Sequence, residues 1–144
     1  MNDLYIKAMK VASSLDVSTS KDCLVLYSVS FLPTKENRDK AFAYVASHKG
    51  AEMIEHTACG AKLIEMGLGS SGICLSEDEV ADIWKEASRR MIAKASGNIT
   101  VFVDGADARS VFRSVELPAI LQNPNINSIN GKDKNSFAKN QGWV

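Results

Sequence analysis

Residues 76–105 constrain the fold more than any other part of the sequence, because a well-marked helix leads directly into an apolar strand. In SEDEVADIWKEASRRMIAKASG, Ser76 followed by Glu79 predicts a capping box, and Gly97 is a natural stop. Arg90 falls outside the apolar stripe, where it can be solvated. NITVFVDG then predicts a buried central strand. The apolar stripe of the helix, at steps of three and four, consists of Val80, Ile83, Trp84, Ala87, Met91, Ile92 and Ala95.

The rest of the chain adds helices and two further strands. This alternation predicts an α/β (or α+β) single domain over 1–144, with an N-terminal helical part and a small, partly parallel sheet flanked by helices. GLGSSG is expected to be a flexible loop without the Lys-Ser/Thr of a phosphate-binding loop. The other expected elements are a helix over 1–14, a strand in CLVLYSVSF, a helix from Thr34 to Gly50, a short helix in ACGAKLIEMGLG, a strand in INSIN and a polar tail anchored by Phe137 and Trp143.

Composition excludes several classes of function. Seventeen basic and seventeen acidic residues leave no net charge, so nothing favours a nucleic-acid partner. The apolar runs are too short to span a membrane, and the first residues do not form a secretion signal. His48 and His56 stand in no ligand pattern, so no metal site is expected. Cys23, Cys59 and Cys74 are an odd, widely spaced set, which favours reduced thiols in a cytosol-like compartment.

Two pairs of residues combine a ring with a hydroxyl. Ser88 lies one turn after Trp84 in the predicted helix, so the pair could form the floor of a cleft that binds a flat ring and a phosphate or ribose. Alternatively, Ser88 bonds back to a carbonyl of its own helix and Trp84 is a core residue. Tyr27 and Ser28, at the end of the first strand, offer the same combination where open α/β sheets bind ligands.

Two glutamates follow apolar residues. In SVFRSVEL an extended backbone would place Phe112, Ser114 and Glu116 on one face, which suits a pocket wall. The alternative is that Glu116 marks a turn before a helix opened by Pro118. Glu55 in MIEHTACG is a second such carboxylate. Two carboxylates near aromatic rings suit the stabilisation of a cationic, sugar-derived transition state.

Three motifs in order carry a resemblance to a known family. IEHTxxG, IWKEASRRMIAKASGNITVFVDG and SVFRSVEL together resemble the ADP-ribosyl cyclase/NAD glycohydrolase family. The resemblance covers residues 60–120 best, and Leu26-Tyr27-Ser28 loosely resembles the family's Leu-Trp-Ser strand end. It implies an ADP-ribosyl cyclase-like fold.

The resemblance also implies roles for individual residues. Glu116 corresponds to the catalytic glutamate, and Glu55 to the glutamate that contacts the nicotinamide amide. Trp84 corresponds to a tryptophan that stacks on nicotinamide, Ser88 to a serine that contacts the diphosphate, and Phe112 to an aromatic residue that contacts the substrate from the far side.

The strand end both matches and departs from the family. Tyr27 stands where the family usually has tryptophan, and Ser28 stands where it has a phosphate-contacting serine. His56 replaces an aspartate and Val29 replaces an arginine. These departures affect phosphate binding and cyclisation more than glycosidic cleavage.

The protein is therefore expected to be an NAD+ glycohydrolase that takes NAD(P) as substrate and needs no metal or other cofactor. The compact, cysteine-poor chain also resembles toxin domains of bacterial contact-dependent or secreted antibacterial effectors. Such toxins are delivered by a larger effector, deplete NAD in competitor cells and are held in check by an immunity protein. Two alternatives remain open: a small ribonuclease toxin, and a non-catalytic binding or immunity-type module in which Glu116 only caps a turn.

Overall fold

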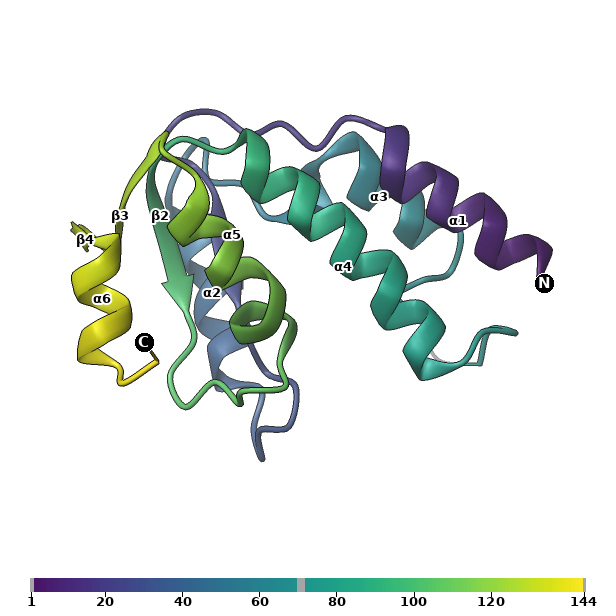
Figure 1. The fold of residues 1–144 in the computed structure, drawn as a ribbon. Coiled ribbons are helices and arrows are strands. Elements are labelled where there is room, and N and C mark those ends of the chain that lie inside the picture. Colours follow the sequence, from purple (N-terminus) through teal and green to yellow (C-terminus); the bar gives the residue numbers. More distant parts are fainter. Residues whose placement is uncertain (1, 70–71, 144) are drawn as a thin grey trace.

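Four short strands form one sheet in the computed structural model, which describes residues 2–69 and 72–143. Along the sheet the strands run in the order β1 (Val25–Tyr27), β2 (Gly97–Phe102), β3 (Ile126–Ile129), β4 (Lys132–Asp133) (Figure 1). The first three are parallel, and β4 runs antiparallel to β3. The expected α/β class with a small, partly parallel sheet is confirmed.

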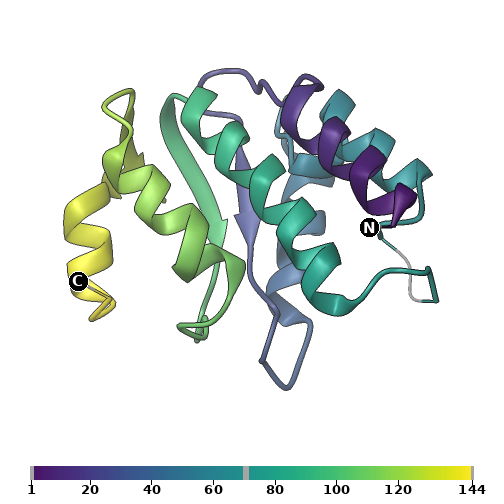
Figure 2. The same cartoon turned by 45° about the vertical axis from the view of Figure 1, so that its right-hand side comes forward.

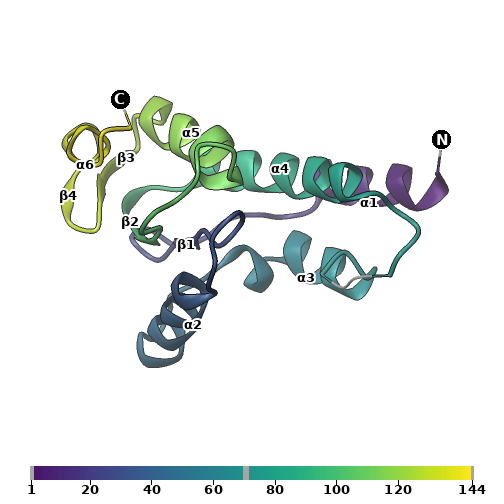
Figure 3. The ribbon, with the colours of Figure 1, turned by 90° about the horizontal axis from the view of Figure 1, so that it is seen from below.

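Helices cover both faces of the sheet (Figure 3). α4 (Glu77–Lys94) and α5 (Leu117–Gln122) lie on one face, and α2 (Glu36–Ser47) lies on the other. Because side chains alternate along a strand, Leu24 and Leu26 join the main core, whereas Val25 packs with Ala41 of α2. The two sides of the core therefore follow from the alternating directions of successive side chains in CLVLY.

The remaining helices lie toward the two ends of the molecule (Figure 2). α1 (Asp3–Ser14) packs along α4, and α3 (Ala58–Glu65) packs against α1. At the other end, α6 (Lys134–Asn140) packs against β3. The expected polar tail is thus wrong in part, because Lys134–Asn140 within it are helical. Its two expected anchors are confirmed, since Phe137 is buried and its ring meets Trp143 edge-on at 6.1 Å.

The predicted long helix is α4, and its start is confirmed in detail. The Ser76 hydroxyl accepts from the Glu79 backbone N–H at 3.1 Å, and the Glu79 carboxylate accepts from the Ser76 N–H at 2.9 Å. The solvated role expected for Arg90 is wrong. Its guanidinium donates to the carbonyl oxygens of Ala12 at 2.7 Å and Leu15 at 3.0 Å, which satisfies the end of α1.

The extended backbone expected for SVFRSVEL, residues 110–117, is also wrong. Residues Phe112–Glu116 form a wide helical turn, η2, in which the Leu117 N–H donates to the Phe112 carbonyl five residues earlier. Pro118 follows at once in α5, and it cannot donate the i→i−4 bond that a regular helix would need there. Wide turns of this kind occur frequently at functional sites.

Two further expectations concern a strand and a loop. The first strand is shorter than CLVLYSVSF, because the backbone leaves the sheet after Tyr27 and Phe31 has a φ of 68°. The expected loop GLGSSG includes Ser70 and Ser71, which lie outside the described residues. Within the described ranges, none of the helices is long and apolar enough to cross a bilayer.

Candidate active site

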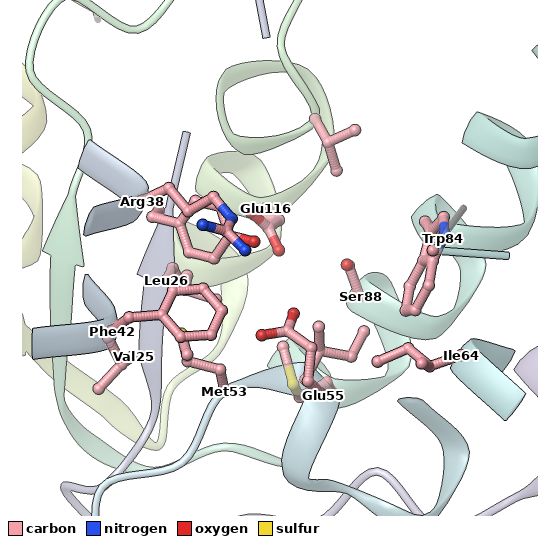
Figure 4. A pocket seen from close by; sticks show the side chains of 15 residues that line it. Val25, Leu26, Arg38, Phe42, Met53, Glu55, Ile64, Trp84, Ser88 and Glu116 are labelled. Carbon is pink, nitrogen blue, oxygen red and sulfur yellow. The ribbon is translucent and has the colours of Figure 1, made fainter. Parts of the chain in front are cut away.

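A pocket of about 620 Å³ opens between the end of β1, the start of α2, η1 (Ile54–His56), α4 and η2 (Figure 4). Its volume falls in the range that small-molecule sites occupy. Glu55, Glu116, Trp84, Ser88 and Tyr27, all predicted from the sequence, line it. Segments that are far apart in the chain thus bring five of the seven expected site residues together.

Glu116 is the most unusual residue in this pocket. It ends η2 and is only 6% exposed, although a carboxylate is seldom buried without a partner. Burial raises its pKa to about 7, the nearby Ser88 hydroxyl opposes that shift, and the charge of Glu55 adds to it. Near neutral pH this carboxyl group therefore exists in both protonation states, as a group in an active site often does.

Glu55 faces Glu116 across the pocket, and the two carboxylates point toward the same space (Figure 4). Burial raises the pKa of Glu55, while His56 and Arg38 oppose the shift. Its Oε2 atom is buried and has no hydrogen-bond partner among residues 2–69 and 72–143. A buried acceptor left in this state favours a ligand that donates a hydrogen bond.

Local structure holds Glu55 in place. Thr57 follows η1 and caps α3, accepting from the Gly60 N–H at 3.0 Å. Gly60 is required there, because a Cβ atom would collide with the Ile54 carbonyl. The close contact between η1 and α3 therefore fixes the backbone from which Glu55 reaches into the pocket.

Trp84 and Ser88 form the α4 wall. The half-buried Trp84 indole lines the pocket, and its N–H donates to the Leu68 carbonyl at 3.1 Å. Ser88 is buried one turn later and lines the same pocket beside Glu116. This geometry agrees with a cleft-lining pair, and the hydrogen bond to Leu68 fixes the plane of the ring.

Two expected site residues do not reach the pocket. Phe112 is fully buried, and its ring meets the edge of Trp143 at a centroid distance of 5.9 Å. Phe112 packs against Trp143 in the core and is not among the residues that line the pocket beside Glu116. Ser28 is buried as well, with its carbonyl accepting from the Asn37 side chain at 2.9 Å.

Two further lining residues could not be identified as site residues from the sequence patterns. Arg38 and Phe42 lie on α2, one turn apart, and both line the pocket opposite Trp84 (Figure 4). The helix carries charges on several sides, so neither residue stands out by periodicity. Only the packing of α2 against the end of β1 brings them to the site.

Comparison with known proteins shows a structural similarity but no match in sequence. No protein-family model matches the sequence, and no curated protein matches it. The structure is similar to porcine CD38 complexed with a covalent intermediate, ribo-F-ribose-5′-phosphate. The TM-score is 0.62 at 20% sequence identity, over 96% of this chain and 78% of that chain. The fold is ADP-ribosyl cyclase-like. That part of the sequence resemblance is confirmed.

Proposed function

We propose that this protein is an NAD+ glycohydrolase, which cleaves the bond between nicotinamide and ribose. The observation that carries the proposal is Glu116, a carboxylate buried in the wall of a pocket that also holds Trp84 and Glu55. A negative charge held away from water is worth most where positive charge develops in a transition state. The proposal rests on this pocket together with the cyclase-like fold.

The chemistry needs few protein groups. When the bond between C1′ of the ribose and the pyridinium nitrogen breaks, its electron pair neutralises the ring and nicotinamide leaves. Positive charge then develops on C1′ and the ring oxygen of the ribose. Ionised Glu116 stabilises that charge, and water adds to C1′, which gives ADP-ribose and one proton. The structurally similar porcine CD38 was solved with a covalent intermediate of a ribose phosphate, which supports a pocket that acts on a ribose.

The other pocket residues bind and orient. The Trp84 indole offers a flat face for the nicotinamide ring. Glu55 Oε2, buried and unpaired within the described residues, suits the amide N–H₂ of nicotinamide. Ser88 stands beside Glu116 and offers a hydroxyl to a ribose or phosphate oxygen. Bound NAD also places a positive pyridinium near Glu116, which lowers the pKa of that carboxyl group and favours its ionised form.

The direct test is release of nicotinamide from NAD by the purified protein. Products are separated so that ADP-ribose, expected as the main product, is distinguished from cyclic ADP-ribose. Glu116→Gln keeps the shape of the side chain but removes its charge. We expect it to fold and to lower turnover by about 10² to 10⁴, which corresponds to about 3 to 5 kcal/mol of transition-state stabilisation.

Glu65→Gln is the matched control, because Glu65 is an exposed glutamate at the end of α3 that, in the part of the chain the structure describes, pairs only with Lys62 on the surface. It should keep full activity. The proposal fails if no nicotinamide appears at high protein concentration, or if Glu116→Gln keeps more than roughly a third of the activity. RNA degradation with NAD left intact would instead favour the ribonuclease alternative, although neither histidine lines the pocket.

The biological setting is a separate matter. The toxin role, delivery by a larger effector and restraint by an immunity protein stay predictions from the sequence resemblance. They are tested by producing the protein inside bacterial cells and following NAD content and growth, with Glu116→Gln as the inactive comparison.

A further inference from the structure

Arg38 brings a positive charge to a pocket that otherwise carries two carboxylates. It is the one lysine or arginine that lines the pocket within residues 2–69 and 72–143. Its side chain is 46% exposed, and its only ion pair in these ranges is a loose 3.9 Å contact with Asp39, its neighbour in the chain. The guanidinium also lies near the Tyr27 hydroxyl, and no carboxylate of these ranges holds it closely, so its N–H donors can reach a ligand.

The position of Arg38 is set by packing. The Asn37 side chain is buried and donates to the carbonyl oxygens of Ser28 at 2.9 Å and Asp104 at 3.0 Å, which ties the start of α2 to the chain beyond β1 and β2. The Arg38 guanidinium lies 4.5 Å from the centre of the Phe42 ring. A cation held over an aromatic face keeps its in-plane N–H donors free.

Arg38 and Trp84 lie on opposite sides of the two carboxylates (Figure 4). If the nicotinamide ring lies on Trp84 and its ribose lies over Glu116, the phosphates of the dinucleotide continue toward α2. A guanidinium is well suited to bind phosphate oxygens there, because it offers two parallel N–H donors.

We propose that Arg38 binds the diphosphate of the substrate and that Phe42 is a positioning residue that holds its guanidinium. The proposal rests on the proposed function, and it assigns roles to two lining residues that the sequence patterns did not indicate. Arg38 then selects substrates by their phosphates and takes no part in breaking the glycosidic bond.

A series of three substrates tests this assignment. NAD carries a diphosphate, nicotinamide mononucleotide one phosphate and nicotinamide riboside none, while the scissile bond is the same. We expect Arg38→Gln to raise KM for NAD by about 10- to 100-fold, the loss typical of hydrogen bonds between charged groups. The effect should be smaller for the mononucleotide and about twofold or less for the riboside. Arg38→Lys should restore part of the loss.

Arg109→Gln is the matched control, because Arg109 also lies over an exposed aromatic ring, that of Phe31 at 4.1 Å, but outside the pocket. It should leave all three substrates unchanged. Phe42→Leu alone should weaken NAD binding. In a double variant with Arg38→Gln, it should weaken NAD binding little further. An equal loss on NAD and on nicotinamide riboside would overturn the proposal.

A binding measurement separates this proposal from the proposed function. Calorimetry with ADP-ribose needs no turnover, so it works even if the protein releases no nicotinamide. Weaker binding of ADP-ribose to Arg38→Gln, by about 10- to 100-fold, would support the phosphate role. Equal affinity for both proteins, or no binding of ADP-ribose to the wild type, would show that Arg38 does not bind the diphosphate.

Discussion

The carboxylates of Glu55 and Glu116 face one another across a single pocket, and the charge on Glu55 contributes to the raised pKa of Glu116. Burial is the larger cause. Two like charges that share a site titrate as a pair, so a change at one alters the pH at which the other ionises.

Glu55→Gln should therefore lower the pKa of Glu116. For the free enzyme, kcat/KM is expected to rise with pH as Glu116 ionises, with a midpoint near the pKa of about 7. Removing the charge of Glu55 should move this midpoint to lower pH, because that charge raises the pKa of Glu116. The measurement is kcat/KM for NAD from pH 5 to 9. Glu52→Gln, a change in the same segment but outside the pocket lining, should leave the midpoint in place.

Ser88→Ala should move the same midpoint in the opposite direction. The Ser88 hydroxyl lowers the pKa of Glu116, so its loss leaves the ionised carboxylate less well stabilised. The pH profile of kcat/KM should shift upward, and activity at pH 6 should fall more than activity at pH 9. Ser14→Ala, at the exposed end of α1, serves as the control. Shifts of the same sign for Ser88→Ala and Glu55→Gln would contradict this account of the pocket.

Stability should fall as pH rises through the range set by Glu116. Its pKa is raised from 4.5 to about 7 on folding, so between these values the folded chain binds more protons than the unfolded chain. The linkage relation then makes the free energy of unfolding decrease with rising pH, by up to about 3 kcal/mol from this group. Urea unfolding at pH 5 and pH 8 measures the change. Glu116→Gln should reduce this dependence, and an unchanged dependence would place its origin elsewhere.

Trp84 variants separate packing from binding. The indole is half-buried and its N–H donates to Leu68, so Trp84→Ala should lower stability by about 1 to 2 kcal/mol, less than for a fully buried tryptophan. The rate of NAD cleavage should fall by much more than this loss of stability can explain. Trp84→Phe keeps a flat ring without the N–H, and it should fold well and lose activity mainly through a higher KM. The two measurements are melting temperature and nicotinamide release. If Trp84→Ala does not fold and Trp84→Phe is fully active, Trp84 is a core residue only.

The sequence predicted the parts of the fold that depend on local patterns. The capping box of Ser76 and Glu79, the stripe of α4 and the short apolar strand in CLVLY each depend on neighbours within a turn or a strand, and each is present. The SVFRSVEL segment is also expected to be extended, yet it is helical. Pro118, directly after the segment, removes a backbone donor locally, whereas the packing of Phe112 against Trp143 is a tertiary effect that a local pattern does not contain.

The same distinction holds for the pocket. Glu55, Glu116, Trp84 and Ser88 carry chemical groups that look out of place on apolar segments, so the sequence indicates them. Arg38 is an ordinary residue on a charged helix, and only the approach of α2 to the end of β1 makes it part of the site. Ser28 shows the converse, since its position after a buried strand predicts a ligand contact, yet it is not among the residues that line the pocket.

The wide turn at 112–116 acts as a rotational offset between two helical segments. A regular helix advances by about 100° per residue, so one extra residue turns everything beyond it by roughly that angle. Leu117 and Ile120 of α5 can thus face the core although Glu116, immediately before them, faces the pocket. Deleting one residue from this turn would rotate the acid relative to the apolar face that now anchors α5. The number of residues in this turn therefore determines both where the Glu116 carboxylate points and which side of α5 packs against the core.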